Sequence, residues 1–244
     1  MCSNGGYTER GIKEIDGFMS ERWRIEPEYA VRVDRSLGTL AVLLEPMSVV
    51  AKAWEHVLEI GRRAFWDPQT VLVVGAGPIG LLAALIGAHF GAEVHVLDRA
   101  TEGPKPRLVS QLGVQYHTGP ISEIGLNPDI VIECTGVEDL VVQAVEAASP
   151  GGIVCLTGVG GAGGRIGGVG ASGLADQMVL NNLVLFGSVN ANRRHYYRGA
   201  RILQEADRAW LDQLVTRRVG ADQIEGALQR GPDDIKVVVE FASP

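Results

Sequence analysis

Residues 75–80 read Gly-Ala-Gly-Pro-Ile-Gly, and this G-x-G-x-x-G turn constrains the fold more than any other feature of the sequence. Four apolar residues, 71–74, precede it, and an apolar stretch of helical length, 79–90, follows it. In such a strand–turn–helix unit the glycines allow a tight turn, close approach of the backbone to a pyrophosphate, and close packing of helix on sheet. The helix N-terminus offers free N–H groups to the phosphates. The residues expected at this dinucleotide site are Gly75, Gly77, Pro78, Ile79 and Gly80.

The strand-then-helix order repeats along the rest of the chain. Strands are expected at 71–74, 94–97, 130–133, 153–157, 184–188 and 236–241. Helices are expected at 79–90, 106–112, 140–148, 174–180 and 193–204. Short, continuous apolar strands that alternate with helices indicate parallel strands buried on both faces. We therefore predict an α/β fold with a doubly wound parallel sheet of the Rossmann type, whose ligand lies beyond the carboxyl ends of the strands.

The first 68 residues have a different pattern. They combine short β-like pieces, 17–24 and 29–33, with one helix at about 46–63 whose apolar residues recur with helical period. Pro46 suits the first turn of that helix. The sequence therefore divides into residues 1–68 and a nucleotide-binding domain at 69–244.

The choice between NAD and NADP stays open. Asp98 ends the second expected strand, 18 residues after Gly80, where a carboxylate accepts hydrogen bonds from a ribose 2′-OH and so favours NAD. Arg99 follows at once, with Lys105 and Arg107 nearby, and cations at this place favour the 2′-phosphate of NADP. Asp98 and Arg99 are both expected cofactor contacts, and they favour different cofactors.

Small residues end the later strands, which would let a dinucleotide lie across the edge of the sheet. They add Thr135, Gly158, Val189 and Asn190 to the expected cofactor site. Cys134 and Cys155 lie in apolar strands and are interpreted as core residues.

Charge, cysteines and hydropathy exclude several classes of partner. The net charge of −7, with no basic run longer than a pair, argues against nucleic acid. Residues 71–92 carry no formal charge and are long enough to span a bilayer, but their glycines and proline fit a strand, a turn and a helix better, so no membrane partner is expected. Three scattered cysteines and the absence of a signal peptide predict a reducing compartment, the cytoplasm.

Glycine is in excess: 32 of the 244 residues, or 13%, are glycine, against an average of about 7%. Many of these glycines lie at 160–170, a stretch without strand or helix period. We expect it to be a mobile loop beside the cofactor.

Five segments, 6–12, 17–21, 44–48, 187–190 and 234–241, resemble the zinc-dependent medium-chain dehydrogenase/reductase superfamily, specifically its glucose 1-dehydrogenase branch. The resemblance covers the whole chain. It implies oxidation of a sugar, an aldose, at C1 to the lactone, with hydride transfer to NAD or NADP and one catalytic zinc. It also implies a homo-oligomer assembled through a sheet edge, for which strand 184–188 is the candidate.

The resemblance assigns roles to four residues of this chain. Glu9 matches a position that touches the sugar, and Glu45 matches the acidic residue near the catalytic zinc, a direct or water-mediated metal ligand. Asn190 matches a residue beside the nicotinamide and substrate, and Lys236 a lysine near the cofactor. Without the resemblance, Glu9 is a surface loop charge and Glu45 a carboxylate favoured by the helix dipole.

The N-terminal zinc-binding Cys and His-Glu pair of the family have no counterpart here, so the chain is expected to be the C-terminal portion of such an enzyme. Residues 1–68 would be the tail end, or remnant, of a GroES-like catalytic domain, and about 215–244 would return toward it. A lone Cys2 cannot build a structural zinc site. The alternatives are a non-catalytic NAD(P)-binding fragment, another zinc-type alcohol or polyol dehydrogenase, and a zinc-free reductase, against which Glu9 and Glu45 argue.

Overall fold

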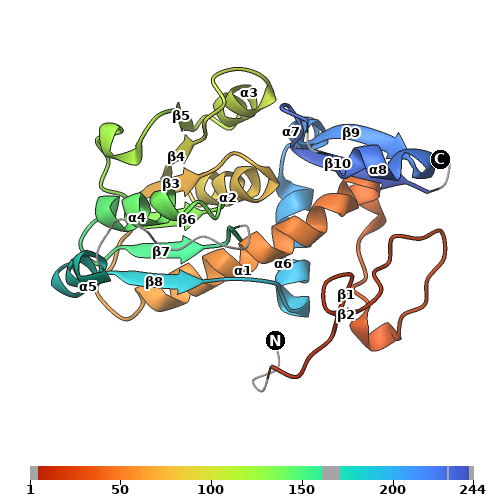
Figure 1. The fold of residues 1–244 in the computed structure, drawn as a ribbon, viewed down its shortest axis with the longest axis horizontal. Coiled ribbons are helices and arrows are strands. Elements are labelled where there is room, and N and C mark those ends of the chain that lie inside the picture. Colours follow the sequence, from red (N-terminus) through yellow and green to blue (C-terminus); the bar gives the residue numbers. More distant parts are fainter. Residues whose placement is uncertain (1–4, 161–170, 230, 242–244) are drawn as a thin grey trace.

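A six-stranded parallel sheet organises the protein, as seen in a computed structural model that describes residues 5–160, 171–229 and 231–241 (Figure 1). The strand order is β5-β4-β3-β6-β7-β8. The strands are β3 (Thr70–Val74), β4 (Glu93–Leu97), β5 (Gln115–His117), β6 (Ile130–Glu133), β7 (Ile153–Leu156) and β8 (Val184–Gly187). From β3 the chain adds β4 and β5 toward one edge of the sheet, and from β6 it adds β7 and β8 toward the other edge, with all strands parallel. This reversal of strand order between β3 and β6 confirms the predicted doubly wound Rossmann sheet.

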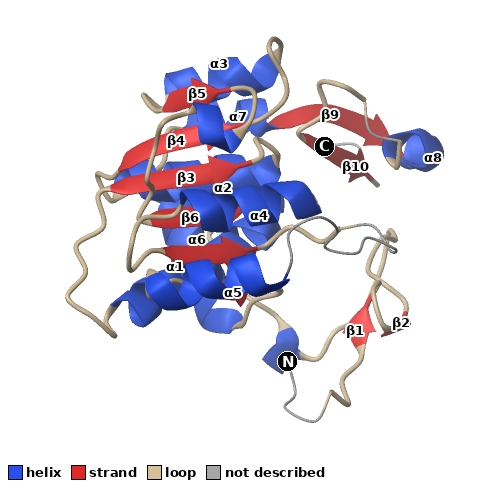
Figure 2. Cartoon of the chain, turned by 60° about the vertical axis from the view of Figure 1, so that its left-hand side comes forward, coloured by secondary structure: helices blue, strands red, loops and turns tan. Residues whose placement is uncertain are grey.

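Helices cover both faces of this sheet (Figure 2). One face carries α1 (Leu44–Gly61), α2 (Pro78–His89), α3 (Pro104–Gln111), α6 (Arg193–Glu205) and α7 (Arg208–Leu214). The other carries α4 (Glu138–Ala147), α5 (Ala171–Leu180) and the short 3₁₀ turn η3 (Ile121–Glu123). Side chains alternate along β3, with Val71 and Val73 in the first core and Leu72 and Val74 in the second. The continuous apolar strands are therefore explained by burial on both sides.

Helix α1 runs antiparallel to the strands. Near its middle, Lys52 contacts Val189, which follows β8, whereas Arg63, just after the helix, contacts the carbonyls of Gly151 and Asn182, which precede β7 and β8. The helix therefore begins on the side of the sheet where the strands end. Together with the preceding 3₁₀ segment η2 (Arg35–Leu43) it is long and apolar enough to cross a membrane, but it is mostly buried and its apolar side belongs to the core beneath the sheet.

The first 34 residues contain little regular structure in their described part. Two-residue strands β1 (Glu9–Arg10) and β2 (Glu14–Ile15) pair with each other, and η1 (Pro27–Tyr29) is a single 3₁₀ turn. The prediction of β-like pieces at 17–24 and 29–33 is wrong, because neither segment forms a strand. Without a neighbouring strand, a short apolar segment gains no ladder of hydrogen bonds.

A small second sheet follows α7 and lies apart from the main one (Figure 1). It pairs β9 (Val215–Gly220) with β10 (Lys236–Glu240) in parallel, with η4 (Ala221–Gln223) and α8 (Ile224–Ala227) between them. The last predicted strand is therefore present. Its partner β9 was not predicted, because Thr216, Arg217 and Arg218 leave no apolar run in this segment.

Candidate functional site

The glycine turn follows β3, at the switch point between β3 and β6 where the strand order reverses. Gly75 has a φ of 99°, a left-handed conformation that favours glycine, and its N–H donates to the carbonyl of Leu97 over 2.6 Å. A Cβ on Gly80 would lie 1.7 Å from the Gly75 carbonyl oxygen. Both glycines are therefore required by the geometry, and Gly77 and Pro78 start α2 with its first N–H groups free of side-chain caps.

Asp98 holds the other side of this turn. Its carboxylate accepts hydrogen bonds from the Ala76 N–H at 2.7 Å and the Ala100 N–H at 3.1 Å, and pairs with Lys105 Nζ at 2.9 Å. The Asp98 side chain is only 9% exposed. Burial alone raises the pKa of Asp98, but the Ala76 N–H and Lys105 outweigh it and hold this pKa below its ordinary value. Arg99 is exposed beside the pair.

The loop after β6 is organised by a buried carboxylate that sequence reasoning missed. Glu133 is fully buried and accepts hydrogen bonds from the Thr135 N–H at 2.6 Å, the Gly136 N–H at 3.1 Å and the Thr135 hydroxyl. The Thr135 methyl group lies against Gly75, where a Cβ would be 2.8 Å from it. Glu133 thereby fixes the loop that faces the glycine turn across the switch point.

The next loop along the edge repeats the same residues. Thr-Gly-Val occurs at 135–137 and again at 157–159, and the two copies interlock, because a Cβ on Gly158 would lie 2.1 Å from the Gly136 nitrogen. The valine of each copy is exposed, Val159 to 84% and Val137 to 50%. The repeat is a signal in the sequence that would have identified both valines.

Beyond β8, Val189 and Asn190 continue this edge. Val189 is also exposed, and Asn190 has a φ of 59°, which few residues other than glycine adopt. The Ser188 hydroxyl oxygen is buried and has no hydrogen-bond partner within the described residues. Val137, Val159 and Val189 therefore offer apolar side chains after three neighbouring strands.

Three further predicted residues, Glu9, Glu45 and Lys236, lie in elements other than the glycine turn and its helix. Glu9 is in β1, where the hydrogen bonds recorded for it involve only its backbone, and Glu45 is exposed in the first turn of α1. Glu45 shares the carboxyl side of the sheet with Asn190, as the direction of α1 requires. Lys236 begins β10 in the small sheet.

Comparison with known proteins identifies the chain. The family described as glucose dehydrogenase C-terminus matches residues 38–241. The chain belongs to this family. Glucose 1-dehydrogenases of Methanocella arvoryzae and Thermoproteus tenax are each 37% identical to it, over 100% and 98% of the chain and 70% of their own length. The solved structure of Haloferax mediterranei glucose dehydrogenase in complex with NADP, Zn and gluconolactone superimposes with a TM-score of 0.91 at 30% identity, over 100% of this chain and 71% of the other.

The described residues of this glucose dehydrogenase-family chain do not fit a zinc ion. Zinc takes three or four Cys, His or carboxylate ligands, and no group of three such side chains is present among them. Burial raises the pKa of the Cys134 and Cys155 thiols to about 12. Cys155 belongs to the core beneath the sheet and Cys134 packs against it, so the interpretation of both as core residues is confirmed. Cys2 and the predicted loop at 160–170, except Gly160, lie outside the described residues.

Proposed function

We propose that the protein is an NAD(P)-dependent sugar dehydrogenase that oxidises an aldose at C1 to the lactone, with transfer of the C1 hydride to NAD(P)+ and release of the hydroxyl proton. The observation that carries this proposal is the glycine turn at the switch point of a chain that superimposes on a glucose dehydrogenase bound to NADP and gluconolactone. When bound, the nicotinamide supplies the hydride acceptor. The chain supplies the groups that hold the dinucleotide.

The residues at the sheet edge fit a dinucleotide. The N-terminus of α2 offers N–H groups to the pyrophosphate, and Gly77, Pro78 and Ile79 are partly exposed there. Thr135, Gly158, Val189 and Asn190 follow β6, β7 and β8, and the exposed valines beside them suit a flat ring system. In this assignment the nicotinamide half lies toward Val189.

Recognition of the adenosine ribose falls to Asp98, Lys105 and Arg99. Lys105 neutralises Asp98, so a 2′-phosphate would not face an uncompensated carboxylate, and the exposed Arg99 adds a positive charge. This arrangement supports acceptance of NADP. It also supports acceptance of NAD, because the 2′-OH of the NAD ribose is able to donate a hydrogen bond to the Asp98 carboxylate. We therefore propose that both cofactors bind.

The catalytic assignments rest on the resemblance. Glu9 would orient the sugar, Asn190 would contact substrate and nicotinamide, Lys236 would approach the cofactor, and Glu45 would serve a metal. The described residues do not provide a zinc site. The same observation favours a second candidate, a protein that binds NAD(P) without hydride transfer.

Domain division and self-association complete the proposal. Residues 69–244 would form the cofactor domain, with about 215–244 returning toward the catalytic part. Residues 1–68 would be the tail end of that catalytic part, and their helix α1 packs beneath the sheet of the cofactor domain. Strand β8 is the last strand of the sheet, which supports a homo-oligomer formed through that edge. Three scattered cysteines support a cytoplasmic location.

Two measurements test this function. Fluorescence titration of the protein with NADPH and NADH is expected to give saturable binding, and absence of binding by both contradicts the proposal. NADP+ reduction is then followed with glucose and other aldoses, with and without added zinc. Sugar-dependent reduction supports the dehydrogenase, whereas NADPH binding with no reduction for any sugar supports the second candidate.

A further inference from the structure

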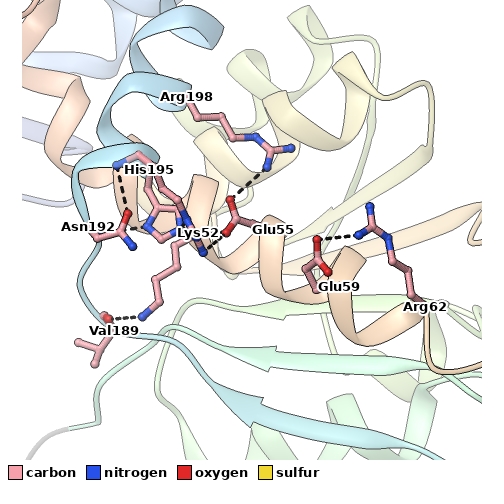
Figure 3. Close-up of polar contacts among 9 residues, drawn as sticks. Lys52, Glu55, Glu59, Arg62, Val189, Asn192, His195 and Arg198 are labelled. Carbon is pink, nitrogen blue, oxygen red and sulfur yellow. Dashed lines mark hydrogen bonds and ion pairs between the residues drawn. The ribbon is translucent and has the colours of Figure 1, made fainter. Parts of the chain in front are cut away.

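Polar side chains of α1 contact both ends of the segment from Val189 to His195 (Figure 3). Lys52 and Glu55 are three residues apart on this helix, so they face the same direction. Lys52 reaches the start of the segment and Glu55 reaches its end, in the first turn of α6. The two contacts connect parts of the chain that are about 140 residues apart.

Lys52 fixes the backbone immediately before Asn190. Its Nζ donates a hydrogen bond to the Val189 carbonyl over 2.8 Å, and within the described residues Lys52 takes part in no ion pair. The Val189 side chain stays exposed while its carbonyl is held, and Asn190 follows in the left-handed conformation. One ammonium group therefore sets which way this turn presents Val189 and Asn190.

Glu55 fixes the other end through three basic side chains. It accepts from His195 Nε2 at 3.3 Å and pairs with Arg194 and with Arg198 at 3.5 Å. His195 is buried, and its Nδ1 accepts the Asn192 N–H at 3.1 Å, which places the ring proton on Nε2. Glu55 Oε1 and Arg194 Nε each lie 3.3 Å from this Nε2. Hydrogen bonding to His195 and the charges around it outweigh burial and hold the pKa of Glu55 below its ordinary value.

We propose that Lys52 and Glu55 are positioning residues, which hold the Val189–Asn190 turn in the shape that receives the nicotinamide half of the dinucleotide. This inference rests on the proposed function, because it presumes that a nicotinamide cofactor lies along the sheet edge. A turn whose backbone is anchored at both ends has little freedom to lose when the ring binds. The adenosine half, at the opposite end of the edge beside Asp98, does not depend on these contacts.

That separation makes the proposal testable with two ligands. Calorimetry compares NADPH with 2′-phospho-ADP-ribose, which lacks the nicotinamide, on the wild type and on Lys52→Met. We expect Lys52→Met to weaken NADPH about tenfold, which corresponds to about 1.4 kcal/mol, and to change the affinity for 2′-phospho-ADP-ribose less than twofold. Lys52→Arg, which keeps a donor, should recover most of the NADPH affinity, and Glu55→Gln should give the same selective loss to a smaller extent.

Arg62→Met is the matched control. Arg62 also lies at α1 and pairs with Glu59 at 2.8 Å, but this pair is on the surface, with the Arg62 side chain 74% exposed (Figure 3). Arg62→Met should leave the affinities for NADPH and for 2′-phospho-ADP-ribose unchanged. Thermal unfolding of each variant shows whether the fold is intact.

The outcomes separate the two proposals. A wild type that binds neither ligand overturns the proposed function, and the positioning role with it. A wild type that binds both, with Lys52→Met weakening both equally or neither, overturns the positioning role alone.

Discussion

The loops at the sheet edge and the N-terminal segment differ in what holds them. At the edge, the carboxylates of the buried Glu133 and the partly buried Asp98 accept backbone N–H groups, and neighbouring loops interlock through glycines. In the N-terminal segment, Glu9 is placed by backbone hydrogen bonds alone, and Trp23 is more than half exposed. The proposed cofactor site is therefore held by its own hydrogen bonds and packing, whereas the proposed sugar contact Glu9 is not fixed by the described residues.

The largest effect is expected from Glu133→Ala, which removes the buried carboxylate at the sheet edge. The N–H groups of Thr135 and Gly136 would lose their acceptor, and leaving two such donors unpaired costs about 3 kcal/mol. Urea unfolding measures this change in the free energy of unfolding, and NADPH affinity should fall with it. Glu133→Gln keeps one acceptor oxygen and should lose less than half as much. Equal losses would show that the charge, and not the hydrogen bonds, holds the loop.

Gly80→Ala is expected to have the next largest effect. Its Cβ would collide with the Gly75 carbonyl, and such overpacking costs about 2 kcal/mol. Gly187→Ala at the end of β8 is the control, since a Cβ there meets nothing within 4 Å. Chemical denaturation of both variants measures the contrast. If both variants match the wild type, the turn is looser than its geometry indicates.

A smaller effect is expected from acid. Burial, followed by the neighbouring His95, lowers the pKa of His117 below its ordinary value of 6.5. The folded protein therefore binds this proton less readily than the unfolded chain, so stability is complete above about pH 6.5 and falls as the pH drops through the lowered pKa. His95 Nδ1 lies 2.8 Å from His117 Nε2 and also contacts Glu93.

Urea unfolding between pH 7.5 and 5 measures this dependence on His117. His117→Asn should reduce the slope, because it removes the group whose pKa burial lowers. An unchanged slope in His117→Asn would assign the acid sensitivity to other groups, such as His56 and His195, whose pKa values burial also lowers.

The smallest effect is expected from Glu9→Gln, in the other region of the comparison. No side-chain hydrogen bond of Glu9 is recorded among the described residues, so both stability and NADPH affinity should stay within about 0.5 kcal/mol of the wild type. Urea unfolding and the NADPH titration check both values. A loss as large as that of Gly80→Ala would remove the distinction between the two regions.

Sequence patterns predicted what local spacing determines. The turn at Gly75, the strand–helix alternation and α1 were confirmed because each depends on residues close together in the chain. The contact of Lys52 with Val189 was not predictable, since it joins residues 137 apart through the packing of α1 beneath the sheet. The role of Glu133 was missed because a charged residue after an apolar run indicates only the end of a strand. Its burial and its hydrogen bonds to the following loop are visible only in the structure.

Amide hydrogen exchange with and without NADPH monitors the sheet edge and the N-terminal segment in one experiment. We predict slower exchange at residues 75–80, 135–137 and 188–190 when NADPH is bound, and no change at 9–15. Slower exchange confined to 9–15, or no change at 75–80, would contradict the assignment of the sheet edge as the cofactor site.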